Sequence, residues 1–177
     1  MGWAFASTSM VVGAITGPFL GAWVCDRFGR KNTFIIASLL FSVSAVFTAI
    51  PRDIATFNIF RFVGGVAVGM CSIASPMYIA EVAPARIRGV LGLLYQLALV
   101  VGALCSLVVS YLLAQYLPES VSWRWIFFSE MVTISAFAIC LFFIPRSPRW
   151  LAQKGFDGQV LEILTRIDGP GYARMEL

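Results

Sequence analysis

The sequence alternates long uncharged stretches with short clusters of charge, and this alternation restricts the chain to a membrane fold. Residues 1–25 and 32–51 contain no charged side chain, whereas the six residues between them contain four, namely Asp26, Arg27, Arg30 and Lys31. A soluble domain of 177 residues carries far more charge than the 12% found here, and the mean hydropathy is +0.85. We therefore predict a polytopic membrane protein.

Five apolar segments are each long enough to cross a bilayer, because a helix needs about 20 apolar residues to span the hydrocarbon core. Backbone amides in lipid must be hydrogen-bonded inside the segment, so we expect every span to be helical and the fold class to be all-α. Residues 1–145 should contain the transmembrane helices, at about 3–24, 33–50, 57–80, 90–116 and 125–144.

Residues 146–177 are more polar, and we expect a short amphipathic helix in this segment. Four apolar side chains there share one helical face: Val160, Ile163, Leu164 and Ile167. A helix of this kind lies at the cytoplasmic surface of the membrane. A solvated linker after the last span is the alternative.

Lysine and arginine are distributed unequally between the two sides of the membrane. If the loop at residues 26–31 lies inside the cell, ten basic residues lie inside and three lie outside, which are Arg52, Arg61 and Arg124. Cytoplasmic loops carry such an excess of positive charge. We therefore expect an integral protein of the cell membrane, with its N-terminus outside and its C-terminus in the cytoplasm.

The same distribution argues against several functional classes. The net charge of +4 comes from basic residues at the ends of spans, so it indicates topology and not a nucleic-acid partner. The sequence has no histidine and no Cys-x-x-Cys motif, so the usual zinc and dithiol sites are absent. We expect no metal, no other cofactor and no enzymatic activity.

Two acidic residues stand where helix polarity disfavours them. Asp26 and Glu81 each end a predicted span at its cytoplasmic C-terminus, where the helix dipole already leaves partial negative charge. Basic residues follow each acid closely: Arg27, Arg30 and Lys31 after the first, and Arg86 and Arg88 after the second. Arginine–carboxylate pairs at a desolvated junction would be strong. A fixed structural junction and a movable gate remain equally open interpretations.

Two charged residues fall inside predicted spans. Arg61 lies about four residues into the third span, and Glu130 about five residues into the last. An intramembrane arginine is costly and usually faces a cavity or a partner, which favours a functional role for Arg61 over snorkelling to the outer interface. We expect Glu130 to snorkel, because Arg124 and the neighbouring tryptophans mark that interface.

Gln96 is nearly alone as a polar side chain in the middle of a long apolar span. Its amide could bind hydroxyl groups of a ligand, or it could bond a neighbouring helix. Two stripes of glycine, at residues 13, 17 and 21 and at residues 65 and 69, have the spacing that lets helix backbones approach closely.

Taken together, these motifs resemble the sugar porter family of the major facilitator superfamily. "GAWVCDRFGRK" is similar to the superfamily's loop motif between helices two and three. "PMYIAEVAPARIRG" resembles the family's P-x-Y-x-x-E-x-x-P-x-x-x-R-G at every fixed position, and "SWRWIF" and "PRSPRWL" resemble the start of helix six and the signature after it. Arg61 with Gly65 and Gly69 resembles the helix-four motif, and Gln96 with Gly102 the helix-five motif.

The resemblance implies an architecture and a role for each matching residue. Family members have twelve helices in two bundles, and these spans look like helices two to six, so the first helix and the second bundle of a parent protein would be missing. Gln96 matches a position that hydrogen-bonds the sugar, and Arg61 matches an arginine that acts in proton coupling with an acid on helix one. The matching cytoplasmic gate network, with the neighbouring cations Lys31 and Arg86 included, is Asp26, Arg27, Gly29, Arg30, Lys31, Glu81, Arg86, Arg88 and Arg149.

One residue departs from the family pattern. Arg146 stands between Pro145 and Ser147, where the family usually has an acid and sometimes a neutral polar residue. The arginine removes a carboxylate partner and adds a cation to a cationic cluster, which would weaken the gate network.

The expected function is secondary transport of a sugar across the lipid bilayer, either alone or in symport with protons, by alternating access. A sugar-sensing receptor that does not transport, a transporter of the same fold for another solute, and an inactive or helper fragment are the alternatives. The residues do not identify the sugar.

Overall fold

The computed structural model describes residues 2–50, 53–84, 86–116, 118–155 and 158. In this part of the chain all regular structure is helical and no strand occurs. The helices are α1 (Gly2–Phe28), α2 (Arg30–Ala49), α3 (Ile54–Val82), α4 (Arg88–Tyr116), α5 (Glu119–Phe143) and α6 (Pro148–Gln153).

Each predicted span lies almost wholly within one helix, from α1 to α5 in order. By length and composition four of the helices could cross a membrane, namely Thr8–Phe28 of α1 together with α2, α3 and α4. The shorter apolar part Phe128–Phe143 belongs to α5. The predicted amphipathic face at residues 160–167 lies outside the described residues, and only the six-residue α6 is seen in that segment.

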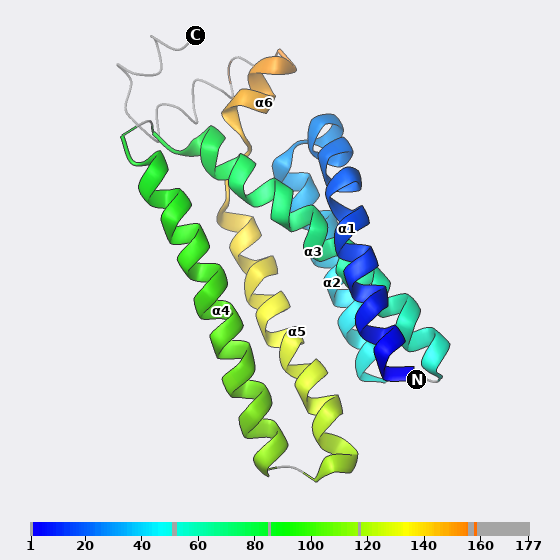
Figure 1. Cartoon of the computed structure of the whole chain (residues 1–177). Coiled ribbons are helices and arrows are strands. Elements are labelled where there is room, and N and C mark those ends of the chain that lie inside the picture. The colour runs from blue at the N-terminus through cyan, green and yellow to red at the C-terminus, as the bar shows by residue number, and fades with distance from the viewer. Residues whose placement is uncertain (1, 51–52, 85, 117, 156–157, 159–177) are drawn as a thin grey trace.

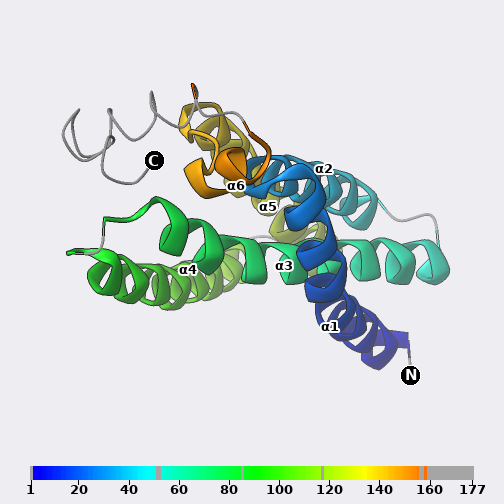
Figure 2. The same ribbon diagram turned by 90° about the horizontal axis from the view of Figure 1, so that it is seen from above.

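The helices run alternately up and down, and their connections gather at two ends. Figure 1 shows α1, α2 and α3 grouped together, with α4 and α5 side by side next to them. The connections α1–α2, α3–α4 and α5–α6 lie at the end that carries α6, which we call the α6 end. Seen from above, α3 runs between the α1 side and the α4 side of the molecule (Figure 2).

The two predicted glycine stripes face each other across the contact between α1 and α3. A Cβ added at Gly13 would meet the carbonyl oxygen of Phe62, and one at Gly65 would meet the carbonyl oxygen of Met10. A Cβ at Gly21 would lie 2.9 Å from the Cα of Met70. The stripes therefore let the two backbones touch, which is how helices associate in lipid.

Two small clusters of buried side chains join the other helices to this pair. One links Val24, Ala37 and Ala67 of α1, α2 and α3. The other lies nearer the α6 end and brings Phe34 of α2 together with Leu141 of α5. By contrast, no residue of α4 is buried. The core thus lies among α1, α2, α3 and α5.

Candidate functional site

The α6 end begins at a turn of one residue. Helix α1 ends at Phe28 and α2 begins at Arg30, so only Gly29 separates them. Gly29 has φ +86° and ψ 159°, a conformation that is essentially restricted to glycine. A Cβ at Gly29 would also lie 3.0 Å from the ring of Trp150. Glycine is therefore required here both by the backbone and by the packing.

This turn corrects one sequence-based expectation. Arg30 and Lys31 were expected to follow the C-terminus of the first span, where cations are favourable, but they are the first two residues of α2. Because a helix N-terminus is partially positive, these cations need other stabilisation there. The contacts of both side chains supply it.

Arg30 and Glu81 form the central ion pair of the site. Arg30 Nη2 lies 2.8 Å from Glu81 Oε1, and the two side chains are only 9% and 6% exposed. Arg30 Nη1 also donates to the Cys25 carbonyl at 3.1 Å. Removing one partner of a buried pair of this kind costs about 3–5 kcal/mol, because the other charge is left uncompensated.

Asp26 interacts with Arg30 more weakly than its position in the sequence suggested. Its Oδ1 lies 3.8 Å from Arg30 Nη1, and its side chain is 78% exposed. Exposed pairs at this separation contribute between zero and about 1 kcal/mol. The two acids that looked equivalent in the sequence are therefore unequal in the structure.

Ser147 completes the coordination of Glu81. Its hydroxyl donates to Glu81 Oε2 at 2.6 Å and accepts from the backbone N–H of Trp150 at 3.3 Å, which caps α6. We call these three residues, Arg30, Glu81 and Ser147, the Glu81 cluster. Our sequence analysis missed Ser147, although a serine directly before a proline at a helix start is a known capping signal.

Side chains from two other helices hold the end of α5. Lys31 Nζ donates to the carbonyl oxygen of Ile144 at 2.7 Å, and the Tyr78 hydroxyl donates to that of Pro145 at 3.0 Å. The indole N–H of Trp150 donates to the backbone oxygen of Asp26 at 3.3 Å. Five helices, α1, α2, α3, α5 and α6, are therefore tied together at one end.

The remaining predicted gate residues make other contacts. Arg27 lies over the rings of Trp23 and Phe28, at 5.7 and 6.0 Å from the ring centroids. Arg88 donates to the Ala83 carbonyl at 3.3 Å. Neither Arg86 nor Arg149 forms a hydrogen bond or ion pair with another residue that the structure describes.

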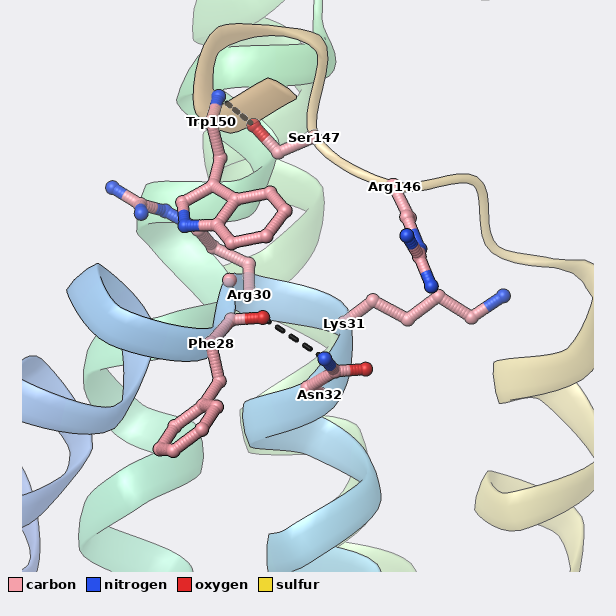
Figure 3. A pocket seen from close by; sticks show the side chains of 8 residues that line it. Phe28, Arg30, Lys31, Asn32, Arg146, Ser147 and Trp150 are labelled. Carbon is pink, nitrogen blue, oxygen red and sulfur yellow. Dashed lines mark hydrogen bonds between the residues drawn. The ribbon is translucent and has the colours of Figure 1, made fainter. Parts of the chain in front are cut away.

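A small pocket opens beside the Glu81 cluster. Figure 3 shows Arg146 extending from the segment before α6 toward Lys31 in the first turn of α2, with the Trp150 ring on the other side. No group of three or more His, Cys, Asp or Glu side chains in the described ranges could hold a metal ion.

Arg61 lies toward the opposite end of α3 and is half-buried. Its Nη1 contacts the sulfur of Met10 at 3.6 Å, and its guanidinium lies over the Phe57 ring at 5.7 Å. Glu130 of α5 is close enough to interact electrostatically with Arg61. Glu130 is thus influenced by the charge of Arg61, and its expected snorkelling stays a prediction.

Gln96 lies on α4 with its side chain exposed. It makes no hydrogen bond to any other described residue, so none of those residues acts as the neighbouring-helix partner considered from the sequence. Its amide is available to a ligand or to a partner outside the described residues. Gln96 and the Glu81 cluster therefore belong to separate regions of the molecule.

Comparisons with known proteins identify sugar transporters as relatives of this chain. The family described as "Sugar (and other) transporter" matches residues 1–177. The chain is 37% identical to the arabinose-proton symporter of Bacillus subtilis (strain 168) over 96% of its length, and 37% identical to the D-xylose-proton symporter of Escherichia coli (strain K12) over 93%. It spans 38% of the length of each symporter.

A solved structure gives the same result for the fold. The proton:xylose symporter XylE bound to 6-bromo-6-deoxy-D-glucose, of the major facilitator superfamily, superposes with a TM-score of 0.94 at 36% sequence identity. The match covers 97% of this chain and 41% of that one.

Proposed function

Because the chain belongs to the sugar transporter family, and is thus an integral membrane protein, we propose that it forms part of a secondary transporter that moves sugars by alternating access. The observation that carries this proposal is the α6 end, where the buried ion pair of the Glu81 cluster and the hydrogen bonds of Lys31, Tyr78 and Trp150 tie five helices together. Such a process makes and breaks contacts between helices, and no covalent bond changes.

The α6 end is the cytoplasmic end in this proposal. Most of the basic residues of the sequence lie in the segments that meet there, as expected for loops inside the cell. A shift of a two-state equilibrium from 1:99 to 99:1 takes about 5.5 kcal/mol. An ion pair that forms in only one of the two states contributes to this bias.

The substrate would bind to the open face of α4. Gln96 is exposed on that helix, and an amide can both donate to and accept from sugar hydroxyl groups. The similar symporters, which are named for arabinose and xylose, are more than twice as long as this chain. The proposal therefore places the other wall of the sugar site on a second bundle, outside this chain.

Protons are the proposed coupling ion, and Arg61 would respond to the protonation of a nearby carboxyl group, because its own guanidinium stays charged. Glu130 lies within electrostatic range of Arg61, so a change in the charge of one alters the energy of the other. The names of the similar symporters, which include protons, support this part of the proposal.

Substitution of Gln96 tests the substrate site. We expect Gln96→Ala, in a transporter that contains this chain, to raise the Km for arabinose or xylose about tenfold, because the loss of one hydrogen bond costs roughly 1.4 kcal/mol. Uptake of radiolabelled sugar into proteoliposomes measures the effect. Gln115→Ala is the matched control, since Gln115 is also exposed but lies at the end of α4.

An unchanged Km for Gln96→Ala would contradict the assignment of Gln96. Saturable sugar binding without uptake would contradict transport itself and indicate a sugar-sensing receptor. Competition by organic acids or ions in place of sugars would indicate a transporter of another solute.

A further inference from the structure

The pocket at the α6 end is lined by cations, with no carboxylate among its lining residues. Three of its residues, Arg30, Lys31 and Arg146, are basic. The complete lining is Phe28, Gly29, Arg30, Lys31, Asn32, Arg146, Ser147 and Trp150. A site of this composition favours an anion.

Two of these cations have no carboxylate partner among the residues that the structure describes. Arg30 is neutralised by Glu81, but Lys31 donates to the neutral carbonyl of Ile144. Arg146 is exposed and forms no hydrogen bond or ion pair with any other residue in the described ranges. Lys31 also stands in the first turn of α2, whose partially positive N-terminus adds to the potential of the pocket.

Arg30 differs from the other two cations of the pocket in its burial. Arg30 is only 8% exposed, and its Nε has no hydrogen-bond partner among the residues that the structure describes. Buried polar atoms are nearly always hydrogen-bonded, to protein or to another molecule. The pocket therefore combines one buried, paired cation with two cations that have no ionic partner among the described residues.

We propose that this pocket binds a phosphate group, held between Lys31 of α2 and Arg146 of the segment before α6. The planar guanidinium of Arg146 can donate two parallel hydrogen bonds to phosphate oxygens, and Lys31 provides a point charge. The N-terminus of α2 is a further favourable contact for an anion. A bound phosphate would bridge the same elements that the Glu81 cluster joins.

The phosphate could come from a lipid headgroup or from solution. Trp23 and Phe28 are exposed at the end of α1 next to the pocket, and aromatic side chains of this kind lie at the membrane–water interface. A phosphodiester of an anionic lipid would then reach the pocket at the level of the headgroups. Inorganic phosphate would reach it from the aqueous side.

The test uses the full chain, purified in detergent and phosphate-free buffer. Native mass spectrometry measures bound phosphatidylglycerol against phosphatidylcholine, and a separate titration measures inorganic phosphate through the thermal unfolding midpoint. We expect Arg146→Gln to weaken phosphatidylglycerol binding about tenfold, the loss expected for a charge-assisted hydrogen bond. Because the Arg146 side chain has no polar partner within the described part of the chain, the variant should fold normally, and its midpoint without ligand checks this.

Arg149→Gln is the matched control, because it removes the same charge from an exposed residue that does not line the pocket. We expect it to leave the affinity nearly unchanged. Binding of the lipid alone would identify a headgroup as the source, whereas binding of inorganic phosphate with the same dependence on Arg146 would identify a soluble one. Equal weakening by both substitutions, or by neither, would overturn the proposal and leave only general surface charge.

Discussion

Helices α3 and α4 have equal lengths and both could span a bilayer, yet their surroundings differ. Helix α3 is in contact with α1, α2 and α4 and buries seven residues, whereas none of the residues of α4 is buried. A Cβ at Gly69 of α3 would lie 2.7 Å from the carbonyl oxygen of Ala14, but one at Gly102 of α4 would meet nothing within 4 Å. Helix α3 is therefore closely packed, whereas α4 is exposed.

Within this chain, hydropathy does not predict burial. Helix α4 is the most apolar of the four candidate spans, and it is the least buried. Apolar side chains gain little by leaving lipid for a protein interior, so close packing depends on small residues and polar contacts. The positions of glycines and buried charges therefore distinguish the closely packed helix α3 from the exposed helix α4.

The largest effect is expected from breaking the buried ion pair that joins the packed helix α3 to α2. Glu81→Gln leaves the Arg30 charge without its partner, so we expect a loss of about 3–5 kcal/mol in the free energy of unfolding. Denaturant or thermal unfolding of the purified chain in detergent measures it. Asp26→Asn is the control, and its exposed, distant carboxylate predicts a change below about 1 kcal/mol. Equal effects of the two substitutions would show that burial does not distinguish the acids.

The second effect concerns the glycines directly. Gly65→Ala places a Cβ against the carbonyl oxygen of Met10, so we expect α1 and α3 to separate at a cost of about 1–3 kcal/mol. Gly102→Ala has open space and a better helix propensity, so we expect no loss and a gain of up to about 1 kcal/mol. Thermal midpoints of both variants make the comparison. Similar losses of thermal stability in both variants would remove the distinction between the packed helix α3 and the exposed helix α4.

The smallest effect lies at the start of α3, away from the Glu81 cluster. Asp53 caps this helix by accepting from the Thr56 backbone N–H at 2.8 Å, and hydrogen bonds from the Thr56 side chain and backbone lower the pKa of Asp53. A lowered folded pKa means that the cap stabilises the protein above the usual aspartate pKa and that this contribution is lost as the pH falls. We expect wild type to lose slightly more thermal stability than Asp53→Asn between about pH 5 and pH 3. Identical pH profiles would show that the cap contributes nothing measurable.

Much of the fold followed from the sequence, because crossing a bilayer imposes strong constraints. Apolar length located the helices, and the glycine spacing at residues 13, 17 and 21 indicated the contact that α1 makes. The sequence did not identify the partner of that contact, which the structure shows to be the stripe at residues 65 and 69. The exposure of α4 could not be predicted, because α4 has the highest hydropathy of the four candidate spans.

The sequence pointed to the region of the site but not to every residue in it, nor to the unequal burial of its acids. The pattern of charges pointed to Asp26 and Glu81 alike, and only burial separates them. The expected placement of Arg30 and Lys31 was wrong because a single glycine reverses the chain, so the cations belong to the next helix. Ser147 was missed because its partner is 66 residues away in the sequence, beyond the reach of local patterns.

The Glu81 cluster also sets an order of events during biosynthesis. Arg30 and Glu81 are both present once α3 has been made, but the hydroxyl that binds the second carboxylate oxygen is added only after α4 and α5. Ribosomes add roughly 5–20 residues per second, so Glu81 waits several seconds for Ser147. During that interval the first three helices can already be held together by their glycines and one ion pair. Closure of the α6 end through Ser147 therefore has to wait until α5 has been made.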